Sequence, residues 1–95
     1  MVSQEQIQEW KAKYGDVFKI TSGDKECFLR TPKRKELSYA SLAGKDDPLA
    51  FNEVILKSCW LGGDEEIKTS DAYFMGASKV IGNIIQIKEA KLEKL

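Results

Sequence analysis

Residues 16–32, DVFKITSGDKECFLRTP, decide the fold class of this chain. Residues 17–20 and 26–30 are short runs rich in β-prone side chains, and the Ser-Gly-Asp-Lys sequence between them has the composition of a tight turn. The sequence therefore predicts a β-hairpin. Because an isolated hairpin is only marginally stable in water, its strands must pack on helices or pair with another chain.

Helical patterns precede and follow this hairpin. Ser3 and Gln6 have the spacing of a capping box, which predicts an amphipathic helix over residues 3–14 that ends at Gly15. Ile7, Trp10 and Tyr14 fall on one face of this helix, which makes it amphipathic.

Two further helices are predicted from a repeated start signal. Thr31 and Asp47 are each followed by proline, which combines an N-cap residue with the residue best tolerated at the first helical position. The helices would occupy residues 33–43 and 48–61.

A final apolar pattern covers residues 71–94 and begins after Ser70. It predicts one helix, or two helices divided at Gly82 and Asn83, because glycine costs about 1 kcal/mol relative to alanine inside a helix. The chain is thus predicted to be one α+β domain, residues 1–95. Its N-terminal helix and β-hairpin are followed by three or four packed helices, so that it is mostly α.

The composition argues against several classes of function. The chain is 42% hydrophobic and 32% charged, and its 15 basic residues balance its 15 acidic ones. A dedicated nucleic-acid binder usually has a basic excess, so nucleic acid is not the expected partner. Without histidine, and with Cys27 and Cys59 far apart, the chain lacks the usual zinc spacings and any His-based catalysis. We expect no catalytic residue, no cofactor and no metal, with the acidic loops solvated.

The N-terminal sequence MVSQEQIQEWK has no apolar run after a basic start, which is unlike a signal peptide. No apolar stretch is long enough to span a bilayer. We therefore expect a cytoplasmic protein without membrane contact, in which the two cysteines stay reduced.

Residues 59–66, CWLGGDEE, combine a glycine pair with three acids. A phosphate cradle is disfavoured, because the acids would repel an anion. The pattern is typical of a helix end, with Gly62 as the left-handed residue after the helix and Gly63 turning the chain.

Two helices carry more apolar surface than one buried face requires. Beside the main face of each helix runs a second stripe, spaced by sevens and fours. This excess predicts self-association or a hydrophobic partner, unless the hairpin and the first helix cover both faces. The candidate partner-binding residues are Leu49, Leu56, Trp60, Tyr73, Val80 and Ile87.

A basic cluster at the predicted start of the second helix is the other candidate contact surface. It consists of Arg30, Lys33, Arg34 and Lys35. A solvated helical turn explains it, although cations are mildly unfavourable at a helix N-terminus, so an acidic partner surface is the alternative.

With these segments in place, the chain resembles the small tail assembly chaperones of long-tailed bacteriophages and prophages. The resemblance spans residues 13–95 and concerns the order and character of the elements. It lies in YGDVFKI at the start of the hairpin, in CFLRTPKRKELSYA from the second strand into a helix, and in PLAFNEVILKSCWLGGDEEI with its acidic turn.

The resemblance implies a non-enzymatic function. Such chaperones are thought to coat the long helical tape measure protein, keep it soluble and bring tail-tube subunits to it. The tape measure and tail-tube proteins are therefore the implied partners, and a homo-oligomer is expected. A second hypothesis is a small phage-encoded regulator that uses the basic cluster against nucleic acid or a host protein.

Overall fold

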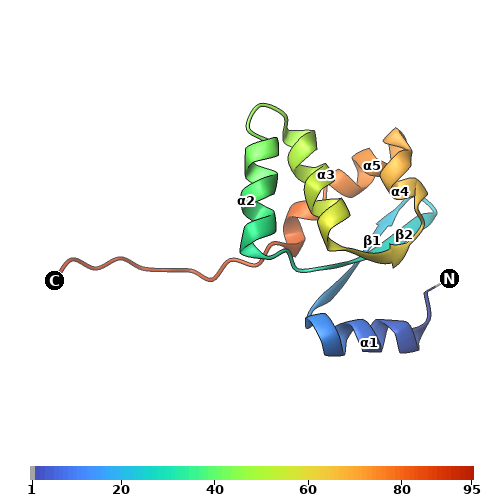
Figure 1. Ribbon diagram of the computed structural model, residues 1–95, viewed down its shortest axis with the longest axis horizontal. Coiled ribbons are helices and arrows are strands. Elements are labelled where there is room, and N and C mark those ends of the chain that lie inside the picture. The colour runs from blue at the N-terminus through green and yellow to red at the C-terminus, as the bar shows by residue number, and fades with distance from the viewer. Residues whose placement is uncertain (1) are drawn as a thin grey trace.

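The computed structural model, which describes residues 2–95, has an α+β fold built around a small antiparallel sheet (Figure 1). Its strands lie in the order β1-β2-β3. Helix α1 lies on one side of the sheet and the remaining helices lie on the other. The elements are α1 (Gln4–Tyr14), β1 (Val17–Ser22), β2 (Lys25–Arg30), α2 (Arg34–Ala43), α3 (Pro48–Cys59), β3 (Trp60–Gly63), α4 (Glu66–Thr69), α5 (Asp71–Ser78) and the 3-10 helix η1 (Ile81–Ile84).

The predicted hairpin is confirmed. Strands β1 and β2 pair in antiparallel register up to Ser22 opposite Lys25, which leaves a two-residue loop. Gly23 in this loop has a φ of 60°, a conformation that glycine adopts without steric cost. The Tyr73 hydroxyl of α5 donates a 2.6 Å hydrogen bond to the Asp24 carboxylate, so the loop is held against a helix from the far end of the chain.

The prediction of a simple helix end at residues 59–66 is wrong. Helix α3 stops at Cys59, and the next four residues form the third strand, with Gly63 opposite Cys27 and Gly62 opposite Phe28. Gly63 has a φ of 125°, whereas Gly62 has no positive φ. Pairing with the otherwise open edge of β2 satisfies backbone groups that a helix end would leave unpaired, and this tertiary contact prevails over the local signal.

The two proline signals have different outcomes. Asp47 caps α3 as predicted, because its carboxylate accepts hydrogen bonds from the backbone N–H groups of Leu49 and Ala50 at 3.1 and 3.3 Å. Thr31 does not cap α2. That helix begins at Arg34, and the Glu36 carboxylate accepts a 2.8 Å hydrogen bond from the backbone N–H of Lys33.

Helix α1 agrees with its prediction to within a residue. The Ser3 hydroxyl accepts a hydrogen bond from the backbone N–H of Gln6, and Gly15 ends the helix with a φ of 85°. On the sheet beneath it, the rings of Trp10 and Phe28 lie 5.8 Å apart between centroids. This contact covers the face of β2 that points away from the other helices.

The prediction of helix over residues 71–94 is wrong for most of its length. Helix α5 ends at Ser78, η1 places Ile81 and Ile84 in the core, and no regular structure follows Ile85. The last residues extend away from the body of the molecule (Figure 1). The side chains of residues 86–95 are exposed, and short helices without tertiary packing are marginal in water.

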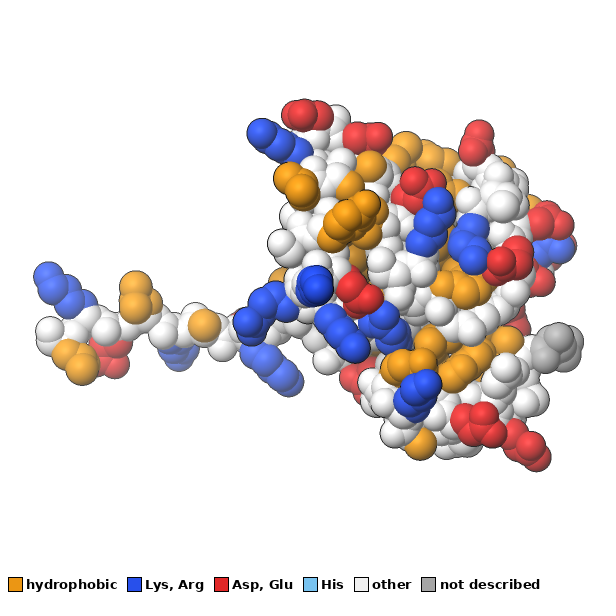
Figure 2. Space-filling model, viewed as in Figure 1, with side chains coloured by type: hydrophobic (Ala, Val, Ile, Leu, Met, Phe, Trp, Pro, Cys, Tyr) orange, Lys and Arg blue, Asp and Glu red, His pale blue; other side chains and the backbone are white. Residues whose placement is uncertain are grey.

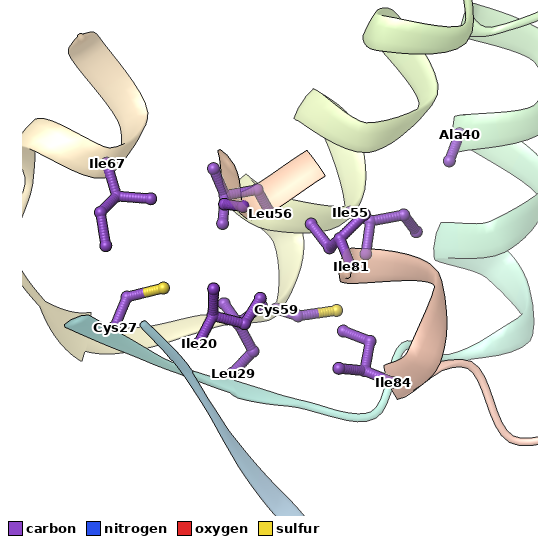
Figure 3. Close-up of a cluster of buried hydrophobic side chains, with 11 residues drawn as sticks. Ile20, Cys27, Leu29, Ala40, Ile55, Leu56, Cys59, Ile67, Ile81 and Ile84 are labelled. Carbon is purple, nitrogen blue, oxygen red and sulfur yellow. The ribbon is translucent and has the colours of Figure 1, made fainter. Parts of the chain in front are cut away.

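The hydrophobic core lies between the sheet and helices α2 to α5 (Figure 3). Strand β2 is its centre, with Cys27 and Leu29 fully buried on the helical side. Burial raises the pKa of the thiols of Cys27 and Cys59 to about 11, so both stay protonated and unreactive at neutral pH. The buried members are Ile20, Cys27, Leu29, Ala40, Ile55, Leu56, Cys59, Ile67, Ala77, Ile81 and Ile84.

Candidate protein-binding surface on helix α2

The six predicted partner-binding residues do not form one exposed stripe. Leu56 is 0% exposed, so its assignment as a surface residue is wrong. Trp60 and Tyr73 are partly buried against the core, and the Lys68 ammonium lies 4.3 Å from the centre of the Trp60 ring. The three exposed members belong to three different segments, α3, the start of η1 and the C-terminal extension; they are Leu49, Val80 and Ile87. The helical spacing that linked the last two is lost because the chain leaves the helix after Ser78.

The basic cluster is also divided. The Arg30 guanidinium donates hydrogen bonds of 2.8 and 2.6 Å to the two carboxylate oxygens of Glu36, and a third, of 2.8 Å, to the backbone carbonyl of Ser58. It therefore ties the end of β2 to the start of α2 and to the last turn of α3. Arg30 is a structural residue in this arrangement, and little of its side chain is available to a partner.

The other three cations of the cluster are exposed. Lys33, Arg34 and Lys35 stand at the start of α2, and none of them takes part in an ion pair within the described chain. Three of the four residues in the predicted patch are therefore exposed.

A surface that the sequence pattern did not reveal lies on the outer face of α2. The side chains of Tyr39 and Leu42 are 66% and 75% exposed, and they border a shallow depression together with polar neighbours. We call this the α2 surface. Figure 2 shows hydrophobic side chains over α2, with Lys and Arg side chains gathered near the start of the helix. The α2 surface is lined by Arg34, Lys35, Ser38, Tyr39, Ser41, Leu42 and Lys45.

The sequence contains only a weak indication of this surface. Ala40 and Leu37 turn toward the core, and Tyr39 and Leu42 lie away from that direction on the same helix. On a helix of ten residues, sequence spacing alone does not separate two large apolar side chains on the outer face from those on the core face. Only the position of α3 shows which face is covered.

The ion pair between Arg30 and Glu36, at the start of α2, gives a stability prediction. Hydrogen bonding from Arg30 is the main cause that lowers the pKa of Glu36 from 4.5 to about 2. A carboxylate with a depressed pKa stabilises the folded state above the unfolded value, and this contribution is lost as the pH falls from about 5 toward 2. Glu36→Gln should lower the free energy of unfolding by about 1–3 kcal/mol at pH 7, after allowance for solvent screening. The difference from the unmodified protein should shrink at pH 3.

Urea unfolding at both pH values measures this effect. Glu53→Gln is the control, because Glu53 forms an exposed pair with Lys57 at 3.7 Å and should contribute no more than about 0.5 kcal/mol. Two outcomes would contradict the assigned role of Arg30 and Glu36. One is an equal decrease in the free energy of unfolding for both variants, and the other is a decrease for Glu36→Gln that does not change with pH.

Within residues 2–95, no three or more Cys, Asp or Glu side chains are grouped so that they could hold a metal ion. Across the same residues, no helix has the length and apolar character needed to cross a membrane. The geometry of the α2 surface, two exposed apolar side chains with cations around them, is suited to noncovalent contact with another molecule.

Comparison of the chain with protein-family models, with curated proteins and with solved structures finds no match.

Proposed function

We propose that this protein is a non-enzymatic tail assembly chaperone of a long-tailed bacteriophage or prophage, acting in the cytoplasm of the host cell. Its task would be to bind the tape measure protein through apolar contacts, keep it soluble and help to recruit tail-tube subunits. The resemblance described above supplies the identity of these partners.

The observation that supports a binding role is the exposure of Tyr39 and Leu42 on α2. Aromatic and aliphatic side chains that project from a helix commonly anchor protein contacts, because burying them releases water from a large apolar area. A helix such as the one expected in a tape measure protein presents an apolar stripe, and helix-against-helix docking is a common mode of peptide recognition.

The docking site differs from the one inferred from periodicity. Of the six residues predicted there, Leu56 is buried, and we assign the principal contact to the α2 surface instead. Leu49, which is exposed at the start of the adjoining helix α3, remains a candidate contact.

Co-expression with the tape measure protein of the same phage genome tests this proposal. We expect the unmodified protein to move the tape measure protein into the soluble fraction. The double variant Tyr39→Asp, Leu42→Asp should lose most of this effect, because two carboxylates would have to be desolvated in the contact. Both positions are exposed, so the thermal unfolding midpoint should change little.

Met75→Asp is the matched control, because Met75 is exposed on α5, outside the α2 surface. It should solubilise the tape measure protein as well as the unmodified chain does. If the unmodified protein does not solubilise it, the chaperone proposal fails. If the double variant still solubilises the tape measure protein, the assignment to the α2 surface fails.

A second candidate function has one observation in its favour, the exposure of Lys33, Arg34 and Lys35, which form no ion pair within residues 2–95. A small regulator could use these cations against nucleic acid or an acidic host protein. Binding would then weaken steeply with salt, because counterions are released from the nucleic acid. Absence of any mobility shift with DNA or RNA at low salt would remove the nucleic-acid version.

A further inference from the structure

The α2 surface is apolar in its middle and basic at the start of the helix. Arg34 and Lys35 belong to the first turn of α2, and Lys45 follows its last turn. Tyr39 and Leu42 lie between them. At the rise of an α-helix, Arg34 and Leu42 are about 12 Å apart along the axis, or roughly two turns.

The cations at the start of this surface are not engaged in ion pairs within residues 2–95. Arg34, Lys35 and Lys45 form no ion pair within the described residues, and no acidic side chain lines the depression. The one acid within α2, Glu36, is engaged by Arg30. This local excess occurs in a chain whose formal net charge is zero.

At the other end of α2, Asp46 and Asp47 follow Lys45, so this end carries no basic excess. The Asp47 carboxylate accepts the backbone N–H groups at the start of α3, which commits it to that helix. Cations at the rim of a contact surface favour acidic partners, through faster association and through exclusion of basic ones. The positive charge therefore restricts the range of possible partners more than the apolar residues do.

The shape of the surface is suited to a helix. Ser38 and Ser41 are small and lie three residues apart, between the two larger side chains and the rim. Their small size contributes to the depression that Tyr39 and Leu42 border. A second helix laid in it would contact Tyr39 and Leu42 with its apolar stripe and the cations at the start of α2 with its flanks.

We infer that the α2 surface binds an amphipathic helix of a partner protein whose apolar stripe is flanked by acidic side chains. This inference rests on the proposed function, because it specifies the chemistry of the helix that the chaperone would hold. Acidic residues of the partner helix meet Arg34 and Lys35 at the start of α2.

Two synthetic helical peptides of about 18 residues test the inference, a length that gives five turns. They share one leucine stripe and differ only in their flanking residues, which are glutamate in the first and lysine in the second. Fluorescence anisotropy with labelled peptides measures both dissociation constants. We expect the full chain to bind the glutamate peptide at least about tenfold more tightly than the lysine peptide, with a preference that declines as salt is raised.

The double variant Arg34→Glu, Lys35→Glu should reverse this preference. Acidic residues are favourable in the first turn of a helix, so its thermal midpoint should be unchanged or higher, which separates lost binding from lost folding. Tyr39→Ser, Leu42→Ser should lose both peptides. Lys79→Glu, which changes an exposed lysine outside the α2 surface, should leave both dissociation constants unchanged.

Equal affinity for the two peptides, no binding of either, or indifference to Arg34→Glu, Lys35→Glu would overturn the inference. So would self-association that light scattering detects in the unmodified chain and that Tyr39→Ser, Leu42→Ser abolishes, because the occupant would then be a second copy. Solubilisation of the tape measure protein without glutamate preference removes this inference alone. Glutamate preference without such solubilisation removes the proposed chaperone function.

Discussion

Leu56→Ala is expected to lower the free energy of unfolding by about 2–5 kcal/mol. The Leu56 side chain is fully buried in α3, within the cluster that joins the sheet to the helices. Truncation removes its apolar contacts and leaves a cavity that close-packed neighbours fill only in part. Because domains of this size are stable by about 5–15 kcal/mol, the loss is a large share of the total. Urea unfolding monitored by tryptophan fluorescence measures it.

Leu49→Ala is the matched control on the same helix. Leu49 is 41% exposed at the start of α3, so its truncation should cost less than about 1 kcal/mol. The pair distinguishes a core position from a surface position with the same chemical change. A small effect of Leu56→Ala would contradict its place in the core and restore the continuous apolar stripe that the sequence predicts.

Gly63→Ala is the second substitution with a large expected effect. A Cβ atom at this position would lie 2.5 Å from the Cα atom of Cys27 and 2.5 Å from the carbonyl oxygen of Glu26. Both are backbone atoms of the adjacent strand and cannot turn aside. The φ of 125° adds strain for any residue other than glycine. We expect a loss of about 2–5 kcal/mol, because strain and overpacking each cost about 1–3 kcal/mol.

Gly82→Ala gives the comparison for this experiment. Gly82 lies in η1, has no positive φ, and has no atom within 4 Å of the position that a Cβ would take. Its replacement should be neutral or slightly stabilising, because alanine restricts the unfolded chain. Thermal unfolding of the two variants side by side tests the pairing of β3 with β2. Similar midpoints for both would mean that Gly63 is not held in the strand.

The local signals of the sequence were sufficient for several elements. The hairpin, the first helix with its glycine end, and the start of α3 at Asp47 all depend on residues within a few positions of one another. Their stabilising interactions, such as the Asp47 carboxylate with two nearby N–H groups, are made inside the segment itself. Such elements are predictable because their causes are local.

The remaining features depend on contacts between distant residues. Strand β3 forms because β2 offers it a free edge, and Leu56 is buried because α3 packs against the sheet and the other helices. The pattern beyond Ser78 has helical spacing but no partner surface, and it remains without regular structure from Ile85 onward.

The sequence by itself determined the α+β class, the hairpin and the caps at Ser3 and Asp47, because those depend on short-range backbone chemistry. The tertiary structure alone decided which apolar face is core and which is surface. Periodicity places side chains on a face of a helix, but it does not say what covers that face. For α2, the packing of α3 on one side left Tyr39 and Leu42 exposed on the other, and this arrangement produced the candidate binding surface.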